Sequence, residues 1–229
     1  MDRHTFNTAF TMGKQMAWRK NINNVVDLAR EIKENTQPNK TSKNINDLKI
    51  KIRNASLRTG GFISEEEILN SIISSNTAAY AFAKDPLKQN FAEIFQYDWI
   101  FKNKNKPNLR KLSSGGSNAV YLVEGEIVTG MSKKPEGSKA TKSIDFQNDN
   151  EYYYAKHTEI CGGAQDNQCN DGKKFVEQAN LYCNKHQDNK VFILLVDGGY
   201  YSEEKKMSIR STISEQNRRR VRVCGSYEV

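Results

Sequence analysis

The sequence has no apolar run long enough to cross a membrane. Its longest run, Val191 to Val196, has the length of one strand, whereas a membrane-spanning helix needs about 18 apolar residues or more. The N-terminal segment MDRHTFNTAF carries charges and lacks the apolar stretch of a secretory signal. These absences predict a soluble, cytoplasmic protein without a membrane partner. The many Asn and Lys residues are typical of an AT-rich bacterial genome.

Cysteine and histidine are also scarce, with four and three residues. The cysteines show no CxxC spacing, and without an export signal reduced thiols are expected. Cys161, Cys169, Cys183 and His186 allow a zinc site in principle, but the first two spacings fit no familiar zinc module. The sequence also has no Ser–His–Asp or Cys–His arrangement and no Gly-rich nucleotide loop. Nucleophilic catalysis and nucleotide binding of those kinds are therefore not expected.

Positive charge is in excess. The formal net charge is +8, and basic residues crowd two segments, 102–111 and 218–222. A basic surplus favours polyanionic partners, because neutralising phosphates releases counterions. Arg218, Arg220 and Arg222 are predicted to contact DNA phosphates, and Arg218 or Arg220 is a candidate for reading guanine. A solvated basic tail is the alternative.

The first hundred residues have a helical pattern. Asn24 to Glu34 and Ile45 to Asn54 place apolar residues at helical spacing. Ser64 followed by three glutamates predicts a capped helix start, with Glu67 completing a capping box. Asp85-Pro86 is predicted to begin a further helix that runs through Phe101. A polar stretch around Pro38 is predicted to be a loop.

After Ser113 the pattern changes to strands. The expected elements are a hairpin (119–123 and 126–129), a polar loop (132–140), strands (143–146 and 151–158), a helix (166–185) and a buried strand (191–196). This order predicts an α/β fold with a mixed central sheet flanked by helices, preceded by a helical part. We expect two domains, a helical region over 1–88 and an α/β core with a basic C-terminal segment over 89–229.

The segment 142–168 carries the most informative chemistry. Metal-assisted hydrolysis of a phosphodiester needs carboxylates to hold the ion and a cation near the attacking water or the phosphate. Two adjacent strands can supply both, and Asp145 and Lys156 fit that arrangement across a tight turn. A partly buried lysine must find an anionic partner. A buried ion pair without catalysis would explain the spacing equally well.

This segment resembles the PD-(D/E)XK nuclease superfamily, and within it the type II restriction endonucleases. Ser143-Ile144-Asp145-Phe146 matches the strand with the family's Asp, and Tyr154-Ala155-Lys156-His157 matches the strand that ends in Lys. Gly162-Gly163, a helix and the strand 191–196 follow in the family's order, so the likeness covers about residues 90–200. It implies a restriction-endonuclease-like core and Mg²⁺-dependent, sequence-specific cleavage of double-stranded DNA. It further implies a homodimer, with the helical region at the dimer interface or clasping DNA.

One departure from the family's pattern is Tyr154, which stands where Glu or Asp is usual. Strand alternation places Tyr154 on the face of Lys156 and Glu151 on the other face. In some members of the superfamily the second carboxylate comes from the following helix or from the helix before the core. Asp166 is the first candidate for this metal ligand and Glu93 the second, with Glu159 third. An ordinary helix cap would explain Asp166 equally well.

The turn 162–168 combines two glycines with amide side chains. Gln165, Asn167 and Gln168 are candidates for DNA contact, since such amides read adenine edges. They could instead bond phosphates or simply close the turn. Two other functions stay open at this point: a DNA-binding module that has lost catalysis, as Tyr154 would allow, and a structure-selective repair nuclease with the same core.

Overall fold

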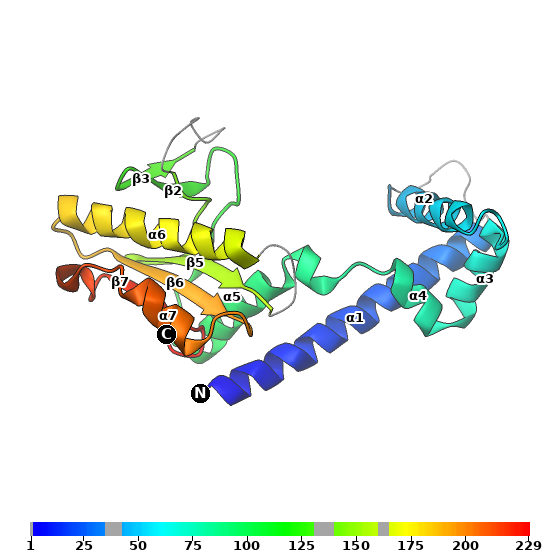
Figure 1. Ribbon diagram of the computed structural model, residues 1–229, viewed down its shortest axis with the longest axis horizontal. Coiled ribbons are helices and arrows are strands. Elements are labelled where there is room, and N and C mark those ends of the chain that lie inside the picture. Colours follow the sequence, from blue (N-terminus) through cyan, green and yellow to red (C-terminus); the bar gives the residue numbers. More distant parts are fainter. Residues whose placement is uncertain (1, 35–42, 131–139, 160–164) are drawn as a thin grey trace. The chain divides into compact units, whose positions relative to one another are not determined.

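The structure of the protein is a computed structural model, which describes residues 2–34, 43–130, 140–159 and 165–229. Backbone contacts divide the chain into two compact units. One comprises Thr8–Phe91, and the other comprises Met1–Asn7 together with Ala92–Val229. The predicted boundary stood between residues 88 and 89. Figure 1 labels most of the helices and strands of both units.

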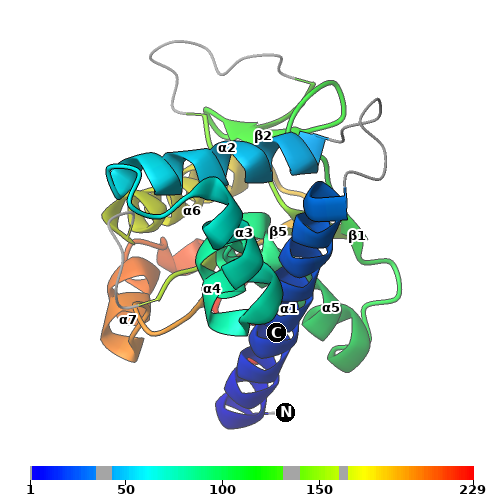
Figure 2. The ribbon, with the colours of Figure 1, turned by 90° about the vertical axis from the view of Figure 1, so that its right-hand side faces the viewer.

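The first unit is helical. Its elements are α1 (Arg3–Glu34), α2 (Lys43–Arg58), α3 (Glu65–Ser74), α4 (Asn76–Phe82) and the 3₁₀ helix η1 (Pro86–Gln89). The first residues of α1 belong to the other unit. Figure 2 looks onto α2, α3 and α4, and α3 packs against the other two. Its core includes Ala29, Leu48 and Ile72, at the spacing that predicted these helices. Among the described helices of the whole chain, none is both long and apolar enough to cross a membrane.

The helix start at Ser64 is confirmed. The Glu67 N–H donates to Ser64 Oγ at 3.2 Å, and the Ser64 N–H donates to Glu67 Oε2 at 2.8 Å. The helix predicted from Asp85 through Phe101 is wrong as a single element. It is divided into η1 and α5 (Phe91–Asn103). The reason is Asn90, whose φ of 59° lies in the left-handed region and cannot continue a right-handed helix.

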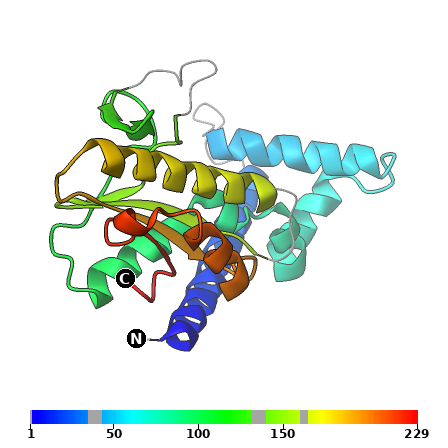
Figure 3. The ribbon, with the colours of Figure 1, turned by 60° about the vertical axis from the view of Figure 1, so that its left-hand side comes forward.

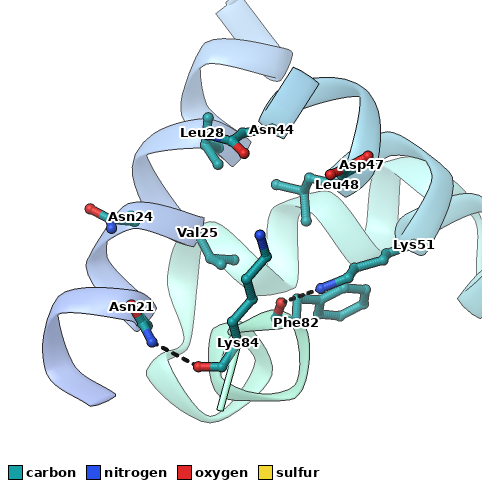
Figure 4. Close-up of a pocket in the computed structure, with 10 residues that line it drawn as sticks. All are labelled: Asn21, Asn24, Val25, Leu28, Asn44, Asp47, Leu48, Lys51, Phe82 and Lys84. Atoms are coloured by element: carbon teal, nitrogen blue, oxygen red, sulfur yellow. Dashed lines mark hydrogen bonds between the residues drawn. The ribbon is translucent and has the colours of Figure 1, made fainter. Parts of the chain in front are cut away.

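A small cleft of about 160 Å³ opens in the helical unit (Figure 4). Val25, Leu28 and Leu48 supply apolar lining. Asn21 Nδ2 donates to the carbonyl of Lys84 at 2.8 Å, and Lys51 Nζ donates to the carbonyl of Phe82 at 3.1 Å. These two bonds tie α1 and α2 to the segment at the end of α4. We therefore assign the polar groups of this cleft to holding the helices together.

The second unit contains a five-stranded mixed sheet in the order β1-β4-β5-β6-β7. Its strands are β1 (Arg110–Lys111), β4 (Phe146–Asn148), β5 (Glu151–His157), β6 (Val191–Asp197) and β7 (Val221–Cys224). Strands β1, β4 and β5 pair antiparallel, whereas β5, β6 and β7 pair parallel. A separate hairpin joins β2 (Val120–Val123) to β3 (Glu126–Thr129), as predicted.

Helices cover both faces of this sheet. Helix α6 (Gln165–Lys185) lies along one face (Figures 1 and 3). Its Phe175 and Val176 pack with Tyr154 and Leu194. On the other, Ile100 of α5 packs in a cluster with strand side chains such as Tyr153 and Ile193. The remaining elements are α7 (Glu203–Arg210) and the 3₁₀ helix η2 (Glu215–Asn217). The α/β class with a mixed sheet flanked by helices is thus confirmed.

The predicted strand 143–146 is displaced in the structure. Residues before Asp145 run along the hairpin, since the Ile144 N–H donates to the Val120 carbonyl at 2.7 Å. Strand β4 begins only at Phe146. Asp145 therefore lies at the junction where the chain leaves the hairpin and enters the main sheet. Outside the described residues lie 132–139 of the predicted loop 132–140, most of the loop around Pro38 and the Gly162-Gly163 pair.

Candidate active site

Asp145 is held at the junction by the backbone of β5. Its N–H donates to the Tyr153 carbonyl at 3.0 Å, and its Oδ2 accepts from the Ala155 N–H at 2.7 Å. The next residue on β5 is Lys156. Side chains of both residues are partly exposed. The antiparallel pairing of β4 and β5 thus places Asp145 beside the strand that contains Lys156.

The two groups perturb each other's ionisation. Burial raises the pKa of Asp145 to about 7, against the opposing effects of Lys156 and of the Ala155 N–H. Burial also lowers the pKa of Lys156, although Asp145 and, after it, Asp171 favour its charged form. A lysine whose pKa is lowered exchanges its proton more readily near neutral pH than an ordinary lysine does. Burial thus dominates the ionisation of both groups, and the charge of each opposes the shift that burial causes in the other.

Tyr154 shares the face of Lys156, as the alternation of β5 predicted. The Lys156 ammonium lies 4.1 Å from the centroid of the Tyr154 ring. That ring is fully buried and stacks on Phe175 of α6 at 5.0 Å between centroids. No group in the described part of the chain hydrogen-bonds the Tyr154 hydroxyl. Tyr154 is therefore a core residue that also supports the lysine.

Glu93, the second candidate ligand, lies beside this pair. It occupies the first turn of α5. Its charge raises the pKa of Asp145 and favours the charged form of Lys156. Its Oε1 lies 2.6 Å from Nζ of Lys111, a half-exposed lysine. Glu93 thus acts electrostatically on Asp145 and Lys156, while its carboxylate contacts Lys111.

Asp171 is an acid that the sequence analysis missed. It lies in α6, and its charge favours the charged form of Lys156. Its Oδ2 lies 2.6 Å from Nζ of Lys142. A signal was present in the sequence: Phe175, Gln178 and Tyr182 follow Asp171 at intervals of four, seven and eleven residues. All three are buried, so helical spacing places Asp171 on the buried face of α6.

Asp166 and Glu159 have other partners. Asp166 accepts a hydrogen bond from the Tyr200 hydroxyl at 2.9 Å. Glu159 Oε1 lies 3.2 Å from Nε2 of His157. On the opposite face, Glu151 accepts from Tyr153 Oη at 2.6 Å. Nothing in these contacts joins Asp166 to the Asp145–Lys156 pair.

The amides predicted to touch DNA lie at the start of α6. Gln165 Nε2 donates to the carbonyl of Glu159 at 3.3 Å. Gln168 Oε1 accepts from the Thr158 hydroxyl, and Asn167 is exposed. Two of the three amides therefore have bonds that hold α6 to the end of β5.

The predicted arginines differ in how far their charge is neutralised. Arg220 Nη2 donates to Asp188 Oδ1 at 2.6 Å, and its Nη1 donates to the His186 carbonyl at 2.7 Å. Arg218 is mostly exposed, 3.8 Å from Glu215, and Arg222 is half-buried on β7. Arg220 thus serves the fold, whereas the exposed Arg218 is available to a partner.

The acids of the site could serve a metal ion that takes few ligands from the protein. Within the described ranges, no group of three or more His, Cys, Asp or Glu side chains is spaced to hold a metal. Mg²⁺ commonly uses only one or two carboxylates, with water and substrate phosphate as its other ligands. Asp145 and Glu93 fit that mode, because the charge of Glu93 opposes ionisation of Asp145 and a cation would relieve this repulsion. Cys169 and Cys183 of the possible zinc site are free buried thiols, and Cys161 lies outside the described residues.

No family model, curated protein or solved structure matches this chain. Its function is therefore inferred from the chemistry of the site.

Proposed function

We propose that the protein is a Mg²⁺-dependent endonuclease that cuts double-stranded DNA at specific sequences, a type II restriction enzyme. The observation that carries the proposal is that the Asp145 carboxylate is bound by the N–H of Ala155, the residue before Lys156, and that the charges of Asp145, Glu93 and Asp171 all act on Lys156. Three acids and a partly buried lysine form a site for hydrolysis of a charged ester rather than a simple ion pair.

Each residue has a distinct role in the proposed reaction. Asp145 would hold the metal ion, with Glu93 or Asp171 as a second ligand. The chemistry that a bound Mg²⁺ supplies is polarisation of the phosphate and a lower pKa of a coordinated water. Lys156 would orient the attacking water and stabilise the negative charge that develops on the phosphate. The Ala155 N–H keeps Asp145 in place, and the Tyr154 ring does the same for Lys156.

The topology supports the same proposal. Helix α5 precedes β1, β4 and β5, which pair antiparallel, and α6 then leads to β6, parallel to β5. This is the order that the resemblance to PD-(D/E)XK nucleases implies. The resemblance also implies a homodimer, because two sites related by a two-fold axis cut both strands of a palindrome. Sedimentation of the protein with and without DNA would test that part.

The decisive experiment is incubation with plasmid and phage DNA, with and without Mg²⁺. Lys156→Ala is the test variant. Lys173→Ala, which removes an exposed lysine of α6, is the matched control. We expect discrete Mg²⁺-dependent fragments from the wild type and the control, and intact DNA from Lys156→Ala.

The other outcomes separate the rival functions. Cleavage only at branched or damaged DNA would replace the proposal with a repair nuclease. A gel shift of intact DNA by the wild type would indicate a binding module that lacks catalysis. Full activity in Lys156→Ala would refute the site assignment.

A further inference from the structure

A polar groove of about 530 Å³ lies next to the candidate active site. Its walls come from β1, the hairpin β2–β3 and β4, and its lining includes Arg110, Lys111, Asn118, Thr129 and Gln147. We propose that this groove binds the sugar-phosphate backbone of DNA beside the bond that is cut. The inference rests on the proposed function and extends it to residues outside the acidic cluster.

The charge of the groove favours a phosphate ligand. Its described lining includes two cations and no acidic residue, and one of the cations, Lys111, is paired with Glu93 outside the groove lining. Arg110 Nη2 donates to Gln147 Oε1 at 2.7 Å, and Gln147 Nε2 donates to the Asp149 carbonyl at 2.9 Å. A neutral amide therefore orients the guanidinium without neutralising it. Arg220 is the contrast, because its guanidinium bonds to the carboxylate of Asp188.

The groove is joined directly to the site. In the β1–β4 pairing, Lys111 lies opposite Phe146, the residue that follows Asp145. The Leu112 N–H donates to the Asp145 carbonyl at 2.8 Å. Lys111 itself lies 2.6 Å from Glu93. A strand whose scissile phosphate sat at Asp145 would therefore have Arg110, one residue before Lys111 on β1, as the next cation. The bond of Arg110 in the groove is to a neutral amide.

The remaining lining suits a nucleic-acid backbone. Ser113, Asn118 and Thr129 offer hydroxyl and amide groups of the kind that bond phosphate and sugar oxygens. Val120, Ile127 and Tyr152 add apolar surface on which the deoxyribose can pack. Such contacts hold a strand in register without reading its sequence. The groove would therefore contribute affinity and position rather than specificity.

The test is DNA binding, measured apart from cleavage. Fluorescence anisotropy with a labelled duplex in EDTA gives the affinity at several salt concentrations. We expect Arg110→Gln to weaken binding about tenfold, as loss of one charge-assisted hydrogen bond allows. The slope of log K against log salt should fall by about 0.9 for the one lost phosphate contact. Arg110 is the primary variant because Lys111→Gln would also release Glu93.

Two controls make the outcome decisive. Lys173→Gln removes one exposed charge from α6 of the same unit and should change the affinity less than twofold, and thermal unfolding of both variants checks the fold. If Arg110→Gln kept the wild-type affinity and salt slope, the proposal for the groove would be overturned. The proposed function would still stand if the wild type cut DNA. Equal losses of affinity in Arg110→Gln and Lys173→Gln would also overturn the proposal for the groove, because they would indicate a general effect of charge. A wild type that neither binds nor cuts DNA would instead refute the proposed function.

Discussion

The ammonium of Lys156 lies over the ring of Tyr154, 4.1 Å from its centroid. A cation at this distance is attracted by the electron-rich face of the ring. The ring is fixed from behind by Phe175, at 5.0 Å. Tyr154, which stands where the resembled nuclease pattern has an acid, therefore has a structural role of its own, which is to hold the Lys156 ammonium over its ring.

This relationship predicts that cleavage requires the Tyr154 ring but not its hydroxyl. Tyr154→Phe keeps the ring and removes a buried hydroxyl that has no partner among the described residues. We expect the free energy of unfolding to stay the same or to rise by up to about 1 kcal/mol, and cleavage to stay within about threefold, which is less than 1 kcal/mol. Tyr154→Leu should lose at least tenfold in cleavage. Urea unfolding measures the stability of each variant, and fragment assays measure its cleavage. Loss of cleavage in Tyr154→Phe would show that the hydroxyl takes part in the reaction.

The two aspartates in the first half of α6 should respond differently to substitution. Asp171 acts on the charge of Lys156, whereas Asp166 bonds to Tyr200. Asp171→Asn should therefore lower the cleavage rate about 100-fold or more, equivalent to about 2.7 kcal/mol, and weaken Mg²⁺ binding measured by calorimetry. Asp166→Asn is the matched control and should cut within about threefold of the wild type. The opposite ranking would restore Asp166 as the second ligand.

The main elements of the fold could be predicted because local patterns dominate them. The alternation of β5, the apolar run of β6 and the capping box at Ser64 each depend on neighbouring residues. Two boundaries could not be predicted. The break at Asn90 depends on one left-handed residue, and the displacement of β4 depends on the pairing of Ile144 with Val120, far away in sequence.

The site was only partly predictable for a similar reason. Asp145 and Lys156 are close in sequence, and a tight turn brings them together. Glu93 is more than fifty residues from Asp145, and only the packing of α5 beside the sheet brings its charge to the site. Asp171 was missed because its effect on Lys156 depends on how α6 packs on the sheet, although its position on the buried face of α6 distinguished it from Asp166.

Gln96 should couple α5 to the sheet. It is buried three residues after Glu93, and its Nε2 donates to Asp197 Oδ2 at 2.7 Å and lies 3.4 Å from the Lys156 carbonyl. Gln96→Leu would remove a donor from the buried Asp197 carboxylate, so we expect a loss of about 1–3 kcal/mol in unfolding free energy. Ile94→Ala, at an exposed position of the same helix, should cost about 0.5 kcal/mol or less. Equal losses in the two variants would argue against the coupling.

Asp188 should make the stability of the α/β unit depend on pH in the acidic range. Burial opposes its ionisation, but hydrogen bonds from Lys190 and Tyr182 outweigh it and lower the pKa of Asp188 to about 2. A carboxyl whose pKa is lowered on folding stabilises the folded chain above about pH 4, its ordinary pKa, and this contribution is lost as the pH falls toward 2.

Asp188→Asn should therefore lower the unfolding free energy at pH 7 by about 1–2 kcal/mol, allowing for solvent screening. Its unfolding free energy should also fall less than that of the wild type between pH 5 and pH 2. Chemical unfolding at a series of pH values measures both effects. Glu215→Gln, at a carboxylate that is 90% exposed, is the control and should follow the wild-type curve. If Asp188→Asn followed that curve as well, the bonds from Lys190, Tyr182 and Arg220 would contribute nothing to stability, and Arg220 would again be a candidate for DNA contact.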